Sequence, residues 1–108
     1  MRIVICTVGK RGDQVISETL CDSDYFIIFD VLEKQIIEKI INNYKSSSGS
    51  EVFCAQLLIG KGIDIVVCGN CEDNAKKLFN EAQIKVLEKL DPNLDRISNE
   101  LRLIPNQS

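Results

Sequence analysis

Five cysteines are the residues with the most chemistry to offer in this 108-residue chain, which contains no histidine. Thiolates bind soft metals and iron–sulfur clusters, and they also act as nucleophiles and redox groups. The absence of histidine excludes a Ser-His-Asp triad, a Cys-His dyad and any imidazole metal ligand. Because five is an odd number, at least one thiol has no disulfide partner within the chain. The chemistry to expect is therefore thiol ligation or thiol redox chemistry.

Four of the cysteines follow or end apolar segments in a way that predicts a shared site. Cys6 lies near the end of the first apolar run, Cys21 lies in a long polar segment, and Cys68 and Cys71 frame the sequence CGNC. If these segments meet at one edge of a sheet, the four thiols converge as metal ligands. Cys21 and Cys71 are then the main candidate ligands, and Cys6 and Cys68 are possible additional ones. Cys54 lies on the apolar stripe of a predicted helix and is expected in the core.

Other interpretations of the same residues stay open. Cys6 and Cys68 lie inside apolar strands, where cysteine is a common small core residue. The Cys68–Cys71 spacing also fits a dithiol redox protein, although a thioredoxin-type site needs a cis-proline and the two prolines are Pro92 and Pro105.

A third interpretation is a small-anion-binding interaction module. Gly69 and Asn70 follow a predicted strand and precede a predicted helix, where backbone N–H groups can cradle an anion. Acidic residues in the loops are expected to be solvated surface, and no catalytic residue is predicted.

The pattern of apolar residues predicts eight elements that position these groups. Strands are expected over residues 1–8, 25–32, 35–41, 63–68 and 84–87, and helices over 51–61, 73–82 and 91–104. The two-residue turn at 33–34 predicts an antiparallel hairpin, and the right-handed crossover rule makes the last two strands parallel to the first. The prediction is an α/β fold with a mixed five-stranded sheet, order 3-2-1-4-5, and helices on its faces. The carboxyl ends of the first and fourth strands then face each other across a crevice.

Composition sets further limits. The length predicts a single domain over residues 1–108, with a tail at 104–108. The net charge of −3 and the lack of any Lys/Arg cluster larger than a pair argue against nucleic acid as a partner. No apolar run is long enough for a membrane span, and no signal peptide is recognisable at the start. We therefore expect a cytoplasmic protein with reduced thiols and no membrane partner.

The sequence resembles a known family over most of its length, roughly residues 2–88. AQLLIGKGIDIVVCGNCEDNA, at residues 55–75, resembles the dinitrogenase iron–molybdenum cofactor biosynthesis family, which includes NifX, NifY and the C-terminal domain of NifB. MRIVICTVG, VISETL and YFIIFDV are similar to the first strand, the following loop and the second strand of that family.

The resemblance implies a ribonuclease-H-like three-layer fold and a non-enzymatic accessory or carrier role. The implied cargo is a metal–sulfur cofactor or its precursor, of the iron–sulfur or iron–molybdenum type. The implied partner is a cluster donor or recipient protein, and the chain is expected to be a monomer or a weak homodimer.

The family pattern also implies which residues contact the cofactor. The chain has Thr19 where the family has a histidine, and it carries extra cysteines in both loops, which could replace the lost donors with thiolates. The cofactor-binding residues implied in this way are Ser17, Glu18, Cys21, Gly69, Asn70 and Cys71.

Overall fold

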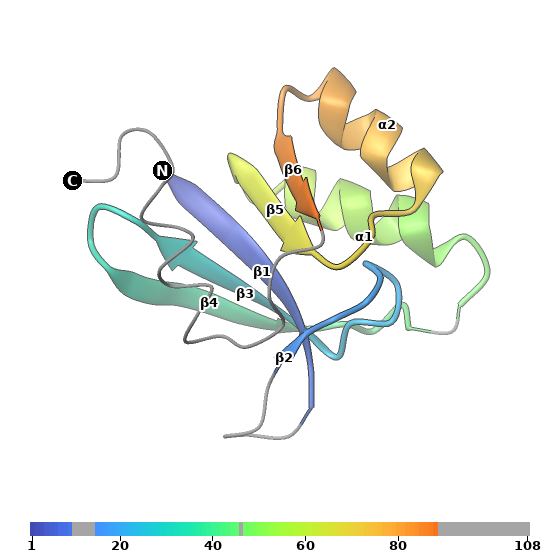
Figure 1. Cartoon of the computed structure of the whole chain (residues 1–108), viewed down its shortest axis with the longest axis horizontal. Helices are drawn as coiled ribbons and strands as arrows, with labels where there is room; N and C mark the ends of the chain where they lie inside the picture. Colours follow the sequence, from blue (N-terminus) through green and yellow to red (C-terminus); the bar gives the residue numbers. More distant parts are fainter. Residues whose placement is uncertain (10–14, 46, 89–108) are drawn as a thin grey trace.

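The computed structural model describes residues 1–9, 15–45 and 47–88 (Figure 1). Its strands are β1 (Arg2–Val8), β2 (Val15–Ile16), β3 (Tyr25–Asp30), β4 (Gln35–Ile41), β5 (Ile65–Cys68) and β6 (Lys85–Glu88). Its helices are α1 (Ser50–Ile59) and α2 (Asp73–Glu81). The seven elements expected within these residues are present, with ends displaced by one or two residues. The short strand β2 was not predicted.

The strands form one mixed sheet in the order β4-β3-β1-β5-β6, which confirms the predicted order. β3 pairs antiparallel with both β1 and β4, whereas β5 pairs parallel with β1 and with β6. β2 lies off this path and pairs antiparallel with the end of β1, which makes a sixth strand. The carboxyl ends of the three parallel strands therefore lie at the same edge of the sheet.

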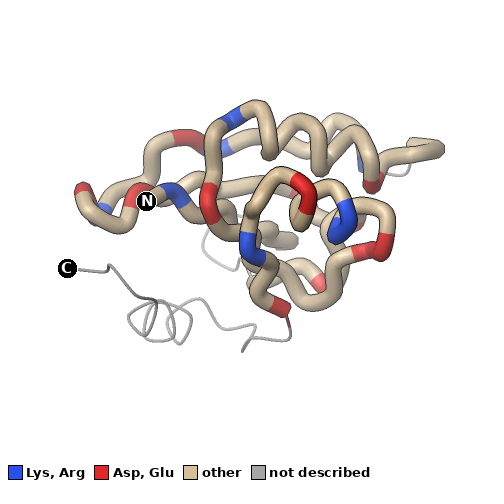
Figure 2. Tube along the Cα trace, turned by 90° about the horizontal axis from the view of Figure 1, so that it is seen from above, with Lys and Arg blue, Asp and Glu red and all other residues tan. Residues whose placement is uncertain are grey.

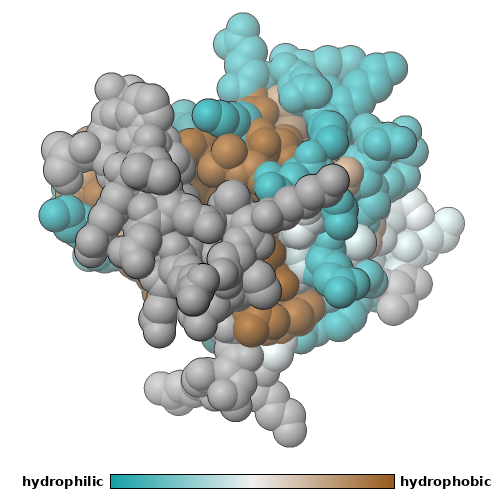
Figure 3. Space-filling view, viewed as in Figure 1, coloured by the Kyte–Doolittle hydropathy of each residue, from teal (hydrophilic) through white to brown (hydrophobic). Residues whose placement is uncertain are grey.

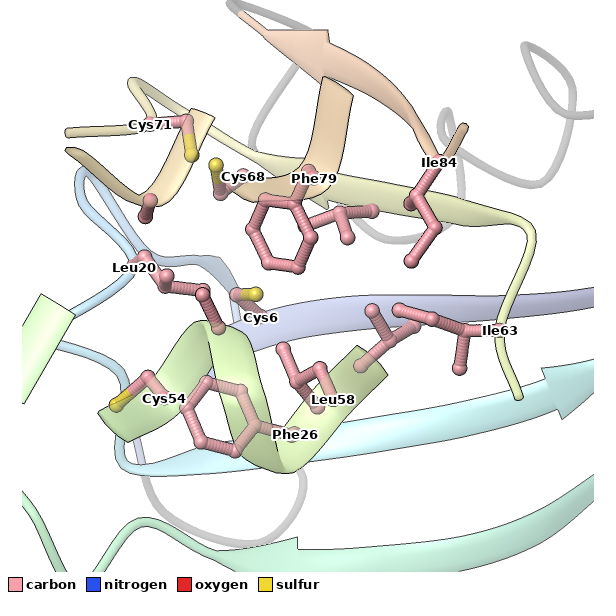
Figure 4. Packing of buried hydrophobic residues seen from close by; sticks show 14 of the residues in the cluster. Cys6, Leu20, Phe26, Cys54, Leu58, Ile63, Cys68, Cys71, Phe79 and Ile84 are labelled. Carbon is pink, nitrogen blue, oxygen red and sulfur yellow. The ribbon is translucent and has the colours of Figure 1, made fainter. Parts of the chain in front are cut away.

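Both described helices cover the same face of the sheet and pack side by side (Figure 1). Alternation along each strand sorts the core, because successive side chains point to opposite faces. Val4 and Cys6 of β1 point toward the helices and form one core cluster with Leu58 of α1 and Phe79 of α2 (Figure 4). Ile3 of β1 belongs to a second apolar cluster on the opposite face. Helices on both faces were expected, so the described part of the fold differs: its only two helices share one face.

The third predicted helix, residues 91–104, lies outside the described residues, as does the tail at 104–108. The described part consists of a sheet layer and one helix layer. The three-layer, ribonuclease-H-like description accordingly remains a prediction.

The surface carries no concentrated charge of either sign among the described residues. Lys and Arg are interspersed with Asp and Glu along the trace (Figure 2). Apolar side chains also reach the surface in the space-filling view (Figure 3), and three exposed isoleucines lie on the edge strand β4, namely Ile36, Ile37 and Ile41. Within the described residues, neither helix is long and apolar enough to cross a membrane.

Candidate thiol site

The candidate site lies where β1 and β5 end, and the segment after β2 fills the space between them. The backbone N–H of Ser17 donates to the Cys6 carbonyl at 2.8 Å, and that of Gly69 donates to the Ser17 carbonyl at 2.8 Å. Asn70 N–H donates to the Glu18 carbonyl at 2.6 Å. The two loops were expected to face each other across an open crevice. Instead, residues 17–19 bridge the strand ends through backbone hydrogen bonds, because main-chain donors that are buried need partners.

The five cysteines form two neighbouring groups, Cys6 with Cys68 and Cys71, and Cys21 with Cys54. They are free thiols. Four of them, Cys6, Cys54, Cys68 and Cys71, belong to the core cluster on the helix face of the sheet (Figure 4). Cys21 is half-buried, and its neighbouring cysteine is Cys54. The structure thus places Cys6, Cys68 and Cys71 near one another, whereas Cys21 neighbours Cys54, which was predicted only as a core residue and is indeed buried.

The inner part of the site consists of Cys6, Cys68 and Cys71. The sulfurs of Cys68 and Cys71 point toward one another (Figure 4), and the two thiols hydrogen-bond. This contact and burial raise the pKa of Cys68 well above its ordinary value. Burial likewise raises the pKa of Cys6, against the opposing effect of a hydrogen bond with Ser23. Cys6 and Cys68 are therefore protonated at neutral pH.

The outer part of the site consists of Cys21 and Cys54 with polar neighbours. Burial, followed by a hydrogen bond with Glu72, raises the pKa of Cys21 to about 12, although a hydrogen bond with Ser50 acts in the opposite direction. Burial and the nearby Glu72 charge raise the pKa of Cys54 to about 11. Its Sγ donates to Asn42 Oδ1 at 3.5 Å. The outer thiols, too, are protonated at neutral pH.

Two glutamates fix the backbone that carries the loop cysteines. Glu72 accepts from the N–H of Leu20 at 2.9 Å and from that of Cys21 at 3.0 Å. Glu88, at the end of β6, accepts from the N–H of Cys71 at 2.7 Å. Carboxylates that accept backbone N–H groups make strong, directional hydrogen bonds. Glu72 and Glu88 thus hold Cys21 and Cys71 in register with the strand ends.

Replacing Glu72 tests this anchoring. Glu72→Ala leaves two partly buried N–H groups without their acceptor, and we expect it to lower the free energy of unfolding by about 1–2 kcal/mol. Glu72→Gln keeps one acceptor oxygen and should lose about half as much. Urea denaturation measures both, with Glu18→Ala, at an exposed loop acid, as the control. Equal stability of the Ala variant and the wild type would show that Glu72 does not anchor the loop.

The four other predicted binding residues have structural roles. Ser17 is buried, and its Oγ donates to the Thr19 carbonyl at 2.6 Å. Gly69 has no room for a side chain, because a Cβ there would lie 2.8 Å from the Glu18 carbonyl oxygen. Glu18 and Asn70 are exposed and contribute backbone hydrogen bonds to the bridge.

Sequence reasoning missed Glu88 and Asn42. Glu88 directly follows a predicted strand whose carboxyl end lies at the same edge as the others, and that position was a usable signal. Asn42 is buried, and its Nδ2 donates to the Cys21 and Ser23 carbonyls at 3.1 and 2.8 Å. No local pattern marks Asn42, because its partners lie about twenty residues away in the chain.

The donors suit a thiophilic metal, although their present arrangement is not that of a formed metal centre. Within residues 1–9, 15–45 and 47–88, no group of three or more Cys, Asp or Glu side chains is placed to hold one metal ion. Thiolates are the ligands that iron–sulfur units and soft metals select. Because Cys6, Cys21, Cys54 and Cys68 are protonated, loading a metal on them would release protons and would require the side chains to rearrange.

Taken together, the sheet order and the two helices define a small α/β protein, and its described residues include five free cysteines. Residues 1–102 match the family described as dinitrogenase iron-molybdenum cofactor, and the chain belongs to that family. The family suggested by the sequence resemblance is thus confirmed.

Several solved structures have a similar fold. The apo form of the orange protein from Desulfovibrio gigas aligns with a TM-score of 0.80 and 20% identity, over 93% of this chain and 85% of that chain. A putative NifB protein from Thermotoga, assigned to the DUF35 family, aligns with a TM-score of 0.76 and 24% identity, over 93% and 85%. A putative dinitrogenase from Methanocaldococcus jannaschii aligns with a TM-score of 0.62 and 18% identity, over 90% and 83%. At these identities the likeness concerns the fold alone. No curated protein matches the sequence.

Proposed function

We propose that this protein is a non-enzymatic, cytoplasmic accessory or carrier protein that binds a metal–sulfur cofactor or its precursor through its cysteines. The observation that carries the proposal is that five free cysteines lie in two neighbouring groups, Cys6 with Cys68 and Cys71, and Cys21 with Cys54. Family membership supports the same class of cargo. A cluster donor or recipient protein is the partner such a role requires.

The burial of the thiols supports a carrier role over a catalytic one. Thiols that are protonated at neutral pH make poor nucleophiles for rapid exchange. Of the two cysteines predicted to lie in loops, Cys21 is half-buried and Cys71 is 5% exposed. The cargo is therefore expected to enter through Cys21 and its loop.

The local charge favours a cargo of low net negative charge. Glu72 and Glu88 both adjoin the thiols, and the cation next to them, Lys76, already pairs with Glu88 at 2.6 Å. An anionic cluster with several negative charges would lack cationic partners among the described residues at this edge. An iron–sulfur unit or a metal precursor fits these surroundings better than a highly charged assembled cofactor.

The backbone N–H groups on which the small-anion alternative depends already have hydrogen-bond acceptors within the protein. The N–H groups of Gly69 and Asn70 were its expected anion ligands, but they donate to the carbonyls of Ser17 and Glu18. The N–H of Cys71 is likewise taken by Glu88. An anion at this turn would have to displace these hydrogen bonds.

Anaerobic reconstitution with ferrous iron and sulfide tests the proposal. We expect the wild-type protein to bind iron and sulfide and to develop visible charge-transfer absorption. Combining Cys21→Ser with Cys71→Ser should remove most of this absorption, because two thiolate ligands are lost. Cys54→Ser, which keeps a donor toward Asn42, is the matched control and should stay coloured.

The outcome is read only on variants that remain folded by circular dichroism. A colourless wild-type product would contradict the proposed function. Colour that is unchanged in the double variant would contradict the assignment of Cys21 and Cys71.

A further inference from the structure

Cys68 and Cys71 are two adjacent thiols whose arrangement favours a disulfide between them. Cys68 is the last residue of β5, and Cys71 lies in the turn that leads to α2. Their exposed fractions are 0% and 5%, their sulfurs point toward one another, and their thiols hydrogen-bond (Figure 4). Disulfide formation requires close β-carbons and converging side chains, and the facing sulfurs of this pair meet the second requirement.

The turn that carries this pair is connected to the rest of the thiol site. Cys71 N–H donates to Glu88, and the next residue, Glu72, accepts from the N–H of Cys21. A shift of Cys71 toward Cys68 would therefore be transmitted to Glu72 and to the loop that carries Cys21. Oxidation of the pair changes both the number of free thiols at the site and the anchoring of its outer part.

We infer that Cys68 and Cys71 form a reversible disulfide that acts as a redox switch on the thiol site. In the reduced state both sulfurs are available as ligands. In the oxidised state two donors are withdrawn and the site no longer takes up cargo. The effect of the switch on cargo uptake rests on the proposed function. Formation of the Cys68–Cys71 disulfide does not depend on it.

A small disulfide such as oxidised glutathione serves as the oxidant. The Cys71 sulfur loses its proton to water and attacks one glutathione sulfur, which breaks the glutathione S–S bond and releases one glutathione thiolate. The Cys68 sulfur then loses its proton and attacks the Cys71 sulfur of the mixed disulfide, releasing the second glutathione thiolate. Two electrons pass from the cysteine pair to glutathione, and both released thiolates are reprotonated.

Cys6 is the competing partner for Cys68, because it lies nearby on the adjacent strand β1. Its thiol hydrogen-bonds with Ser23, and its pKa is raised by complete burial. Cys71 is the more accessible of the two candidates, and only two residues separate it from Cys68. Oxidation is therefore expected to stop at the Cys68–Cys71 bond.

The first experiment equilibrates the folded protein with mixtures of oxidised and reduced glutathione without oxygen. Free thiols are then alkylated in denaturant, and the peptides are mapped by mass spectrometry. We expect loss of two alkylatable thiols, a cross-link between Cys68 and Cys71, and full reversal by reduced glutathione. Cys71→Ser, or Cys71→Ala if the serine variant does not fold, should keep Cys68 free of a cross-link, and the matched control Cys54→Ser should still form the bond.

Other products would overturn the inference. These are a cross-link through Cys6, Cys21 or Cys54, a stable glutathione adduct on Cys71 without a cross-link, or no oxidation at all.

The second experiment tests the switch itself by loading the oxidised and reduced forms with iron and sulfide. We expect the oxidised form to bind less than about one tenth of the iron bound by the reduced form, because two thiolate donors are gone. Equal loading would overturn the switch. If the reduced form binds no iron, the proposed function fails, and the switch is then tested on Cys21. The alkylation rate of Cys21 should rise when the Cys68–Cys71 disulfide forms. An unchanged rate would overturn the coupling between this disulfide and the loop that carries Cys21.

Discussion

Cys21 in the folded protein is expected to react with a thiol reagent roughly fiftyfold more slowly at pH 8 than in the unfolded chain. Burial and the Glu72 carboxylate raise its pKa to about 12 from an ordinary value of 9.0. This lowers the thiolate fraction at pH 8 about a thousandfold. The greater nucleophilicity of a more basic thiolate recovers a factor of about twenty, because the Brønsted coefficient is about 0.4–0.5. The net expectation is a slow thiol despite its partial exposure.

The pH profile distinguishes this cause from simple steric blocking. The rate should keep rising about tenfold per pH unit through pH 9 and 10, whereas the unfolded chain should level off above pH 9. Reaction with Ellman's reagent, with the modified residue identified by peptide mapping, measures both profiles. Glu72→Gln should speed the reaction, because the carboxylate contributes to the raised pKa. A folded protein that levels off near pH 9 would contradict the assigned cause.

The same raised pKa values make the folded state sensitive to alkali. Cys21 and Cys54 have folded pKa values of about 12 and about 11, both above the unfolded value of 9.0. The unfolded chain therefore loses these protons first as the pH rises. The contribution of the protonated thiols to stability is fully present below pH 9 and is lost between pH 9 and about 12.

Gly69→Ala is expected to lower the free energy of unfolding by about 2–3 kcal/mol, the upper part of the usual range for overpacking. A Cβ at this position would lie 2.8 Å from the Glu18 carbonyl oxygen and 2.9 Å from the Glu18 Cα. Both are backbone atoms, so no flexible side chain can move aside. The only relief is separation of the bridge at residues 17–19 from the turn after β5.

Gly60→Ala provides the matched control for this substitution. A Cβ there would lie no closer than 3.4 Å to its nearest neighbour, and the residue has ordinary right-handed helical angles. Urea denaturation of both variants should show a large loss for Gly69→Ala and little change for Gly60→Ala. Equal midpoints would mean that the bridge is not a rigid part of the fold. Because the bridge positions Cys21, Gly69→Ala should also increase the alkylation rate of Cys21.

The apolar pattern predicted the order of the sheet because each relevant signal was local. The runs at β1 and β5 are buried on both faces, and the predicted antiparallel hairpin is present, although its turn spans the four residues 31–34 and not two. Strand β2 escaped prediction because two residues carry no periodicity. It pairs with Thr7 and Val8 of β1, which lie seven to nine positions earlier in the chain.

The sequence by itself determined the element order, the family and the kind of chemistry, since thiol content and the absence of histidine are properties of composition. Only the tertiary structure decided how the cysteines are grouped: Cys71 in the core beside Cys68, and Cys54 as a neighbour of Cys21. It also decided that Gly69 serves packing and that Glu72 and Glu88 anchor the loops. The physical reason is distance along the chain. Contacts between residues 17 to 52 positions apart depend on how the sheet brings strand ends together, and no local spacing encodes them.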